Sequence, residues 1–493
     1  MLFLLLLVSC LVLCVTILVR RNHNYWKKRG IVQVDGVLLK FFKSKRAIAE
    51  IYKEMYDEHQ QNHIGFFVGS PTLMIKDVQD LQAVFQSNFQ NFYSRGIFSN
   101  TKEVLADNVL SIDEYRRWKL LRQKLSPVFT SMKLKSMFYI MERCARDFVK
   151  YIEEKKMIRS ETFKSLSNYT TSCIGASLFG IDTHTQNTMD SPFLEMTQKT
   201  VEPSLMNNLK ISLSFLSPTL SNSLNIKIFG EHEEFFVGTV KKMLHLHRNS
   251  KEKRHDFIDT CVELQDQGTM VDPTTGYQVE PTDEVIAAQA FFFFIAGVDT
   301  SATAMHFTLL ELASHPDILK KVHAEIDEVF DDCNENLTYE DVEKLDYLDM
   351  VISESLRKYP PIGAIQRKCS KSITLPSGTH IKKDDLIVIP VYALHRDEKY
   401  FPNPTVFDPE RFAPENVSKI VKFSYLPFGE GNRILQNSMT HSPIYLSTNS
   451  LNSSTYSLIH SQIQFYLTNI KSKCKSLMFS YLLFNNANRL NGF

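Results

Sequence analysis

The stretch AFFFFIAGVDTSATA, residues 290–304, lies at the centre of the longest apolar-periodic run in the chain. This run predicts one helix from about Thr282 to Ser314, with Pro281 before it and Pro316 after it. A helix of this length spans roughly 50 Å. We therefore expect it to cross the whole domain that contains it.

Three residues interrupt the apolar character of this helix. Gly297 costs about 1 kcal/mol relative to Ala in a helix interior, and we expect it to ease a local kink and open room beside the helix for a ligand. Asp299 and Thr300 follow it. An acid and a hydroxyl side by side in a dry pocket can relay protons to a bound oxygen species. The alternative is a buried helix with a polar kink, and this segment alone does not decide between them.

The remaining pattern predicts a mainly α fold with a small β part. Residues from about 46 to 350 form apolar-periodic runs separated by short polar breaks, which is typical of helices. A further helix is expected at about Tyr347–Tyr359, where Pro360 and Pro361 stop it. Strand-like stretches are few, and they are residues 64–74, 372–375 and 386–390.

Charge and cysteine content narrow the functional classes. The 493 residues carry a net charge of +1, from 56 basic and 55 acidic side chains. This balance gives no electrostatic case for binding nucleic acid. The eight cysteines are scattered without a CxxC pair, which favours a reducing compartment.

The N-terminal segment has the properties of a membrane anchor. Residues 1–19 contain no charged side chain and would span roughly 28 Å as a helix. The basic cluster in residues 20–29 follows this run, so the positive-inside rule places the rest of the chain in the cytosol. We expect a transmembrane anchor at 1–19 and a basic linker at 20–45, with Tyr25 and Trp26 at the membrane interface. A cleaved signal peptide is the alternative, but a basic n-region and a small-residue cleavage site are not evident.

Two further spacings place polar side chains on one helix face. Glu354 and Arg357 stand at i and i+3 and can pair, and Arg411 in FDPERF could bring a second guanidinium to Glu354. Such a buried group would be a scaffold lock; alone, the pair would be an ordinary surface ion pair. Trp118 and Arg122, about one turn apart, present an indole N–H and a guanidinium that suit a carboxylate or phosphate. Taken alone, they would more often be a packed surface pair.

These segments occur together in this chain, and their residues and order resemble those of the cytochrome P450 family of microsomal haem-thiolate monooxygenases. The resemblance covers roughly residues 50 to 433 and is closest to animal microsomal members related to the drug-metabolising clan. The segments that carry it are WKLLR (118–122) as W-x-x-x-R, AGVDTS (296–301) as the oxygen-groove motif, ESLR (354–357) as E-x-x-R, PERF (409–412), and PFGEGNR (427–433) as the first half of the haem loop F-x-x-G-x-R-x-C.

The resemblance implies a cytochrome P450 fold, with a catalytic domain at residues 46–433. It implies haem (iron protoporphyrin IX) as cofactor and the insertion of one oxygen atom of O2 into a lipophilic small molecule with NADPH-derived electrons. The expected partners are NADPH-cytochrome P450 reductase, cytochrome b5 as a second electron donor, the substrate and the membrane. The expected location is the endoplasmic reticulum membrane, with the catalytic domain in the cytosol.

The resemblance also assigns roles residue by residue. The residues expected to bind the haem propionates are Trp118, Arg122, Arg367 and Arg433. Asp299 and Thr300 would deliver protons during oxygen scission. The core beneath the haem would be locked by Glu354, Arg357 and Arg411. Some of Phe291–Phe294 would line the substrate pocket, with plain core packing as the alternative.

The chain departs from the family pattern at Leu435, where the pattern has the axial cysteine that ligates the haem iron. Leucine cannot coordinate iron, and neither Cys474 nor His441 lies in a glycine-bent loop. The helix that should follow the cysteine and the last strands of the fold are also missing or replaced. The Ser/Asn-rich tail, residues 434–493, contains no Asp or Glu, whereas the preceding residues hold all 55.

Two interpretations of this tail stay open. It can come from a different reading of the gene, such as a retained intron, a frame change or an alternative final exon, in which case the authentic enzyme carries the cysteine. Alternatively, the chain is a catalytically inactive P450-like membrane protein, either a pseudoenzyme or a mis-spliced isoform, because Leu435 replaces the axial cysteine.

Overall fold

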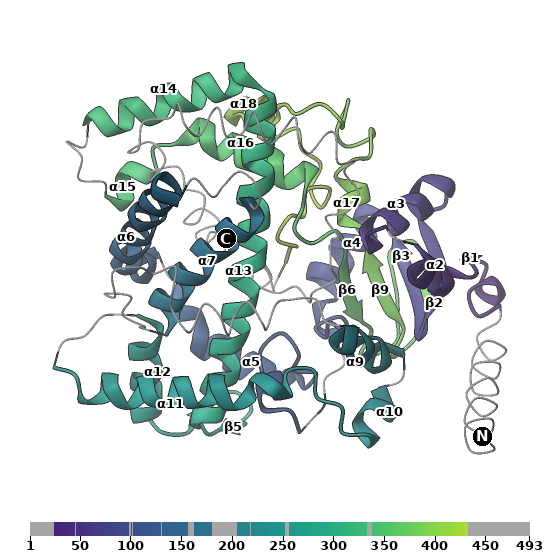
Figure 1. The fold of residues 1–493 in the computed structure, drawn as a ribbon. Helices are drawn as coiled ribbons and strands as arrows, with labels where there is room; N and C mark the ends of the chain where they lie inside the picture. The colour runs from purple at the N-terminus through teal and green to yellow at the C-terminus, as the bar shows by residue number, and fades with distance from the viewer. Residues whose placement is uncertain are drawn as a thin grey trace, which may run out of the picture.

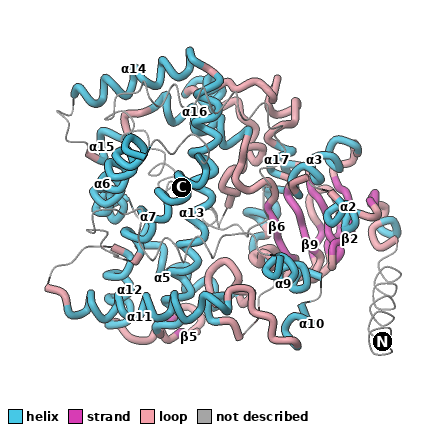
Figure 2. The backbone as a smooth tube through the Cα atoms, in the orientation of Figure 1, coloured by secondary structure: helices cyan, strands magenta, loops and turns pink. Residues whose placement is uncertain are grey.

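The computed structural model describes residues 24–431 except 45, 98–99, 101, 130, 156–161, 180–204, 217, 252–255 and 333–337. The described part is mainly helical with a small β part, as the sequence predicts. Helices make up one side of the molecule, and the largest sheet lies at the other side with α2 and α3 beside it (Figure 1 and Figure 2).

The helices differ widely in length, from single turns to the long helix that the sequence predicts. The α-helices are α2 (Val37–Lys43), α3 (Ile48–Glu58), α4 (Val78–Gln82), α5 (Tyr115–Leu125), α6 (Ser131–Lys155), α7 (Thr162–Leu178), α9 (Leu205–Leu216), α10 (Pro218–Ser223), α11 (Glu233–Asn249), α12 (Phe257–Asp266), α13 (Asp283–Ser314), α14 (Pro316–Asp332), α15 (Tyr339–Val342), α16 (Asp346–Lys358), α17 (Val391–Leu394) and α18 (Pro414–Val417). The short helices used below are η2 (Ala83–Ser87) and η9 (Pro409–Phe412).

The largest sheet has the strand order β1-β2-β3-β9-β6. Its strands are β1 (Val32–Val34), β2 (His63–Val68), β3 (Ser70–Ile75), β6 (Ile365–Lys368) and β9 (Leu386–Ile389), and two small ladders pair β4 (Met270–Val271) with β5 (Gln278–Val279) and β7 (Ile373–Thr374) with β8 (His380–Ile381). The stretch 64–74, expected as one strand, is a hairpin that turns at Gly69. Sequence reasoning missed β6 as a strand, because IQRK has no alternating apolar pattern.

The central helix α13 runs unbroken through the helical side of the molecule (Figure 1). Thr282 caps its first turn by accepting a hydrogen bond from Val285 N–H at 3.3 Å. A Cβ at Gly297 would lie 2.5 Å from Ile174 Cδ1 of α7. Gly297 was expected to open room for a ligand. This expectation is wrong for the space that the missing Cβ leaves, because Ile174 of α7 fills that space. The glycine instead allows α7 to pack closely against α13.

Aromatic residues of α13 belong to the hydrophobic core. Phe291 and Phe294 contact Phe236 of α11, with ring centroids 4.7 and 5.6 Å apart. Phe293 contacts Phe257 of α12 at 5.6 Å. Core packing, the alternative to pocket lining, is what the structure shows for these phenylalanines.

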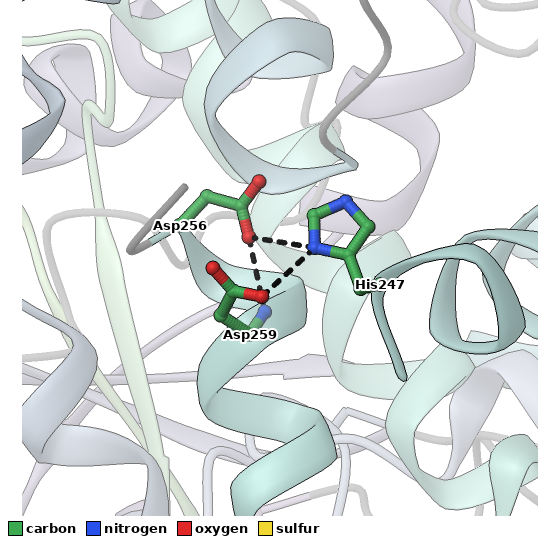
Figure 3. A group of neighbouring side chains, drawn as sticks. All are labelled: His247, Asp256 and Asp259. Atoms are coloured by element: carbon green, nitrogen blue, oxygen red, sulfur yellow. Dashed lines mark hydrogen bonds and ion pairs between the residues drawn. The ribbon is translucent and has the colours of Figure 1, made fainter. Parts of the chain in front are cut away.

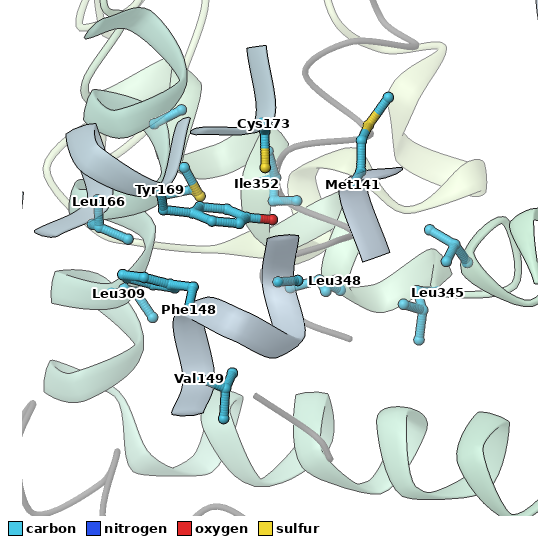
Figure 4. Close-up of a cluster of buried hydrophobic side chains, with 14 of the residues drawn as sticks. Met141, Phe148, Val149, Leu166, Tyr169, Cys173, Leu309, Leu345, Leu348 and Ile352 are labelled. Carbon is cyan, nitrogen blue, oxygen red and sulfur yellow. The ribbon is translucent and has the colours of Figure 1, made fainter. Parts of the chain in front are cut away.

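A second core cluster joins α6, α7, α13 and α16 (Figure 4). Phe148 of α6 stacks on Tyr169 of α7 with ring centroids 4.8 Å apart, and both rings are almost fully buried. Leu348 and Ile352 bring α16 into the same cluster. The positions of α13 and α16 relative to each other are therefore fixed by close packing.

The described part of the segment expected as a linker is folded onto the sheet. Trp26, expected at a membrane interface, is only 1% exposed. Its indole N–H donates to Phe66 O at 3.2 Å, and its ring covers Gly65, where a Cβ would lie 2.1 Å from Trp26 Cγ. The interfacial assignment of Trp26 is therefore wrong, because the side chain fills a space that a glycine leaves on β2.

The expected anchor, residues 1–19, lies outside the described residues. Within the described part, α13 is long and apolar enough to cross a bilayer, but 78% of its apolar window is buried inside the protein. Burial of this kind is typical of a core helix.

Candidate functional site

The Glu354–Arg357 pair of α16 is fully buried. Arg357 Nε donates to Glu354 Oε2 at 2.7 Å, and Arg357 Nη2 donates to Oε1 at 2.8 Å. The two residues stand one turn apart on one helix face, as the i, i+3 spacing predicts. A bidentate geometry is the strong form of a carboxylate–guanidinium contact.

The same pair holds two loops that follow in sequence. Arg357 Nη1 donates to His395 O at 2.7 Å, and Nη2 donates to Pro404 O at 2.9 Å. Glu354 Oε1 accepts from Asp408 N–H at 3.0 Å and lies 3.5 Å from Arg411 Nε of η9. The structure thus brings together the three residues Glu354, Arg357 and Arg411.

His395 extends this network toward the loop that contains Gly429 and Gly431, which both have positive φ. Its Nδ1 lies 3.1 Å from Arg357 O, and its Nε2 accepts from Leu426 N–H at 2.7 Å. Burial, together with the charge of Arg357, lowers the pKa of His395 to about 3. His395 is therefore neutral at physiological pH, with Nδ1 as the donor. The segment ALHRD, residues 393–397, contains no local pattern that would predict this role.

Trp118 and Arg122 are both buried on α5. The Arg122 guanidinium carbon lies 5.4 Å from the Trp118 ring centroid. Both residues line a cavity of about 370 Å³ between α5 and the segment around Gln86. Burial lowers the pKa of Arg122 to about 10. The expected pair is therefore not a surface pair, and it faces a space that can hold an anionic group.

Arg367 of β6 is 1% exposed. Its Nη1 donates to Gln366 O at 2.8 Å, while Nε and Nη2 have no hydrogen-bond partner among the described residues. Burial lowers the pKa of Arg367 to about 10. A buried guanidinium with two unsatisfied donors is costly, and an anionic ligand would offset that cost.

Phe85 of η2 contacts both Arg367 and Gly431, and sequence reasoning missed this residue. The Arg367 guanidinium carbon lies 5.3 Å from the Phe85 ring centroid. Gly431, in the left-handed region at φ 81°, has its α-carbon so close to Phe85 that a Cβ would lie 2.1 Å from Phe85 O. The next residue, Gln86, lines the cavity of Trp118. Only the tertiary structure reveals this position, because Phe85 belongs to no recognisable motif in the sequence.

Asp299 and Thr300 are consecutive residues of α13. Burial raises the pKa of Asp299 to about 6. Thr300 Oγ1 donates to Ala296 O at 2.6 Å, one turn earlier. A carboxyl with this pKa changes protonation near neutral pH, which suits proton transfer.

Two further buried residues, Arg95 and Cys369, adjoin β6, the strand that carries Arg367. Arg95, which sequence reasoning missed, is buried, and its carbonyl accepts from Gln366 Nε2 at 3.1 Å, beside Arg367. The Cys369 thiol donates to Lys371 O at 3.1 Å, and burial raises its pKa to about 11. Cys369 is therefore a protonated, structural residue.

The remaining expected residues of the haem loop, Arg433 and Leu435, lie outside the described residues. Cys474 and His441 also lie outside them.

A separate buried cluster links α11 to α12 (Figure 3). His247 Nδ1 lies 3.0 Å from Asp259 Oδ1 and 3.7 Å from Asp256 Oδ1. Asp256 also caps α12 by accepting from Asp259 N–H at 3.0 Å. Three such groups could surround a metal ion, but these hydrogen bonds already give the cluster a structural role as a link between two helices.

Comparisons with known proteins agree on one family. The family model described as "Cytochrome P450" matches residues 35–434. Cytochrome P450 6k1 of Blattella germanica is 33% identical over 83% of this chain and 82% of that protein. Cytochrome P450 6a2 of Drosophila melanogaster is 33% identical over 84% and 85%, and cytochrome P450 6B6 of Helicoverpa armigera is 34% identical over 86% of both chains.

Replacement of Glu354 by Gln tests the buried pair. Glu354→Gln leaves the Arg357 charge buried without its counter-ion, so we expect the free energy of unfolding to fall by about 3–5 kcal/mol. The control is Glu410→Gln, which removes an exposed partner of Lys321 and should cost less than about 1 kcal/mol. Denaturant unfolding measures both, and similar losses in the two variants would contradict the buried-pair interpretation.

Acid lability tests His395. Its pKa is about 3 in the folded protein and about 6.5 when unfolded, so between these values the unfolded state binds one proton more. Stability should therefore fall as pH drops through this window, by up to about 1.4 kcal/mol per pH unit from this group. In His395→Gln that contribution disappears, whereas the exposed control His380→Gln keeps it. Equal pH slopes in wild type and His395→Gln would refute the assignment.

Proposed function

This chain belongs to the cytochrome P450 family, and from that premise we propose that it inserts one oxygen atom of O2 into a lipophilic small molecule with electrons derived from NADPH. Members of the family are haem-containing monooxygenases. The observation that carries the proposal is the buried Arg367, whose Nε and Nη2 have no hydrogen-bond partner among the described residues.

The described residues fit the carboxylate end of a haem. Arg367 offers two unused N–H donors, and Trp118 and Arg122 line a cavity that Gln86 of η2 also lines. We propose that these residues, with Arg433, bind the two propionates as charge-assisted hydrogen-bond donors. Bound haem supplies the iron centre that activates oxygen.

Asp299 and Thr300 are the proposed proton carriers. The Asp299 carboxyl, with a pKa of about 6, exists in both protonation states near neutral pH, so it can take up a proton from water and release it again. The Thr300 hydroxyl is held by Ala296 O, which leaves its oxygen lone pairs as acceptors. Glu354, Arg357 and Arg411 take no part in proton transfer and serve as the lock of the scaffold.

We propose that the active form carries a cysteine two residues after Arg433. The family match ends at residue 434, and the acid-free tail begins at the same place. Leu435 has no lone pair to offer to iron, whereas a thiolate ligates it. The comparisons give no support to the inactive alternative, so a different reading of the final exon is the proposal that we retain.

The proposed cellular setting follows from the N-terminal segment. Residues 1–19 would anchor the chain in the endoplasmic reticulum membrane and leave the catalytic domain in the cytosol. There, NADPH-cytochrome P450 reductase would supply electrons, with cytochrome b5 as a second donor. In this proposal the folded domain includes the described residues between 24 and 45, because Trp26 and β1 pack on the sheet, and the divergent tail covers residues 434–493.

Sequencing of the 3′ end of the transcript, combined with spectroscopy, tests the proposed function. We expect a message that encodes cysteine two codons after Arg433, and a protein from that message that binds haem and shows the carbon monoxide difference spectrum of a thiolate ligand. If every message encodes Leu435 and the expressed chain incorporates no haem, the monooxygenase proposal fails for this protein.

Replacement of Asp299 by Asn tests the proton carrier. In the cysteine-bearing form, Asp299→Asn should lower product formed per NADPH consumed by about 100-fold, within the usual range for loss of a proton-transfer group, while substrate affinity stays within about twofold. The control is the exposed Asp317→Asn on α14, which should leave this ratio unchanged. Unaltered coupling in Asp299→Asn would remove the carboxyl from the mechanism.

A further inference from the structure

Thr170 of α7 makes a hydrogen bond to the central helix immediately before the proposed proton carriers. The helix α7 packs against α13 (Figure 1), and Thr170 is fully buried between them. Thr170 Oγ1 donates to Val298 O at 3.1 Å. The Val298 carbonyl and the Asp299 N–H belong to one planar peptide group. The bond from α7 therefore acts directly on the backbone that carries the Asp299 side chain.

The Thr170 hydroxyl has a second acceptor within reach, but that acceptor does not need its proton. Ser167 O, on the preceding turn of α7, lies 3.0 Å from Thr170 Oγ1. Ser167 O also accepts from Thr171 Oγ1 at the shorter distance of 2.7 Å, and in an α-helix it accepts from Thr171 N–H as well. A carbonyl oxygen has two lone pairs, and a hydroxyl has one proton to donate. The Thr170 proton is therefore best used on Val298 O.

Ile174, one turn further along α7, restricts the same part of α13 by its shape. A Cβ at Gly297 would lie 2.5 Å from Ile174 Cδ1, so the isoleucine occupies the space that the glycine leaves. The steric contact and the hydrogen bond from α7 thus act on consecutive residues, Gly297 and Val298. Together they fix the axial position and the rotation of α13 at the point where Asp299 and Thr300 follow.

The helix that carries Thr170 is held in place by its other side chains. Leu166, Tyr169 and Cys173 of α7 belong to the core cluster that also contains residues of α6 and α16 (Figure 4). The ring of Tyr169 stacks on Phe148 of α6. Close packing of this kind leaves a helix little freedom to shift. Thr170 therefore donates from a rigid support.

The alternative is that the Thr170 hydroxyl has no role beyond its own hydrogen bonding, as when a threonine donates to a carbonyl one turn earlier. Thr308 of α13 is such a residue, because it is fully buried and its Oγ1 donates to Ala304 O of the same helix at 2.7 Å. The bond from Thr170 differs, since it joins two helices. Thr308 is therefore a matched control for the loss of a buried hydroxyl.

We propose that Thr170 is a positioning residue for proton delivery, which holds the peptide group of Asp299 in place through Val298 O. The inference rests on the proposed monooxygenase function, since it adds a residue to the part of the site that carries protons. Thr170 donates its own proton to a backbone carbonyl and takes no part in the transfer. It acts on the Asp299 carboxyl only through the backbone of α13.

The pKa of Asp299 tests this inference without haem or turnover. In the full chain as expressed, infrared difference spectroscopy titrates the protonated carboxyl band that is absent from Asp299→Asn. Thr170→Val keeps the shape of the side chain and removes the hydroxyl. We expect it to lower the pKa of Asp299 from about 6 to about 5, because a carboxyl that is held less firmly in its buried position reaches water more often. Thr170→Ser, which keeps the donor, and the control Thr308→Val should leave this pKa within about 0.3 of the wild-type value.

Coupling in the cysteine-bearing form is the second readout. Thr170→Val should lower product formed per NADPH consumed by about tenfold, since a misplaced proton-transfer group keeps part of its effect. The KM for the substrate should stay within about twofold, because Thr170 acts on proton transfer and not on binding. Thr170→Ser should restore most of the coupling, and Thr308→Val should leave it unchanged.

The inference is overturned if the pKa of Asp299 is the same in folded Thr170→Val as in the wild type, or if Thr308→Val shifts it equally. Unchanged coupling of Thr170→Val in an active enzyme also overturns it. Thr170→Ala gives the same comparison if Thr170→Val does not fold. A chain that shows the pKa shift but forms no product with NADPH contradicts the monooxygenase proposal alone, and an active enzyme without the shift contradicts only the role of Thr170.

Discussion

The buried ion pair between Glu354 and Arg357 is the constraint on which the rest of the structure depends. Two opposite charges removed from water are tolerated only when nearly every donor and acceptor finds a partner. Carbonyl groups of two successive loops and the amide of Asp408 supply those partners. The loops must therefore adopt one conformation for the pair to be buried at all, and the pair contributes specificity of structure more than net stability. Through His395 the same requirement reaches Leu426, just before the glycine-bent loop.

Much of the helical framework could be predicted from local pattern. The flanking prolines and Thr282 give the bounds of α13 within a residue, and the prolines after Tyr359 end α16 close to the predicted position. The spacing of Glu354 and Arg357 specifies a shared helix face, because that geometry is local. These features follow from periodicity and capping, which act within one or two turns.

The features that could not be predicted depend on tertiary contacts. Trp26 resembles an interfacial residue until Gly65 provides a space for its ring. Gly297 resembles a kink residue until Ile174 occupies the place of its missing side chain. Phe85 carries no motif, yet its ring lies beside the buried arginine of β6. In each case a partner distant in sequence determines the role, and a single sequence does not identify that partner.

The length of α13 has a consequence for biosynthesis. Its charge-free part, residues 285–298, extends about 21 Å, which is less than the roughly 30 Å hydrocarbon thickness of a bilayer. Any segment of this helix long enough to span the membrane must therefore include a carboxylate, and Asp299 would lie deep in the lipid, at a cost of about 2.5–3.5 kcal/mol near the centre. The carboxyl that we propose as a proton carrier thus also opposes insertion of α13 into the membrane during translation, before α16 packs against the helix.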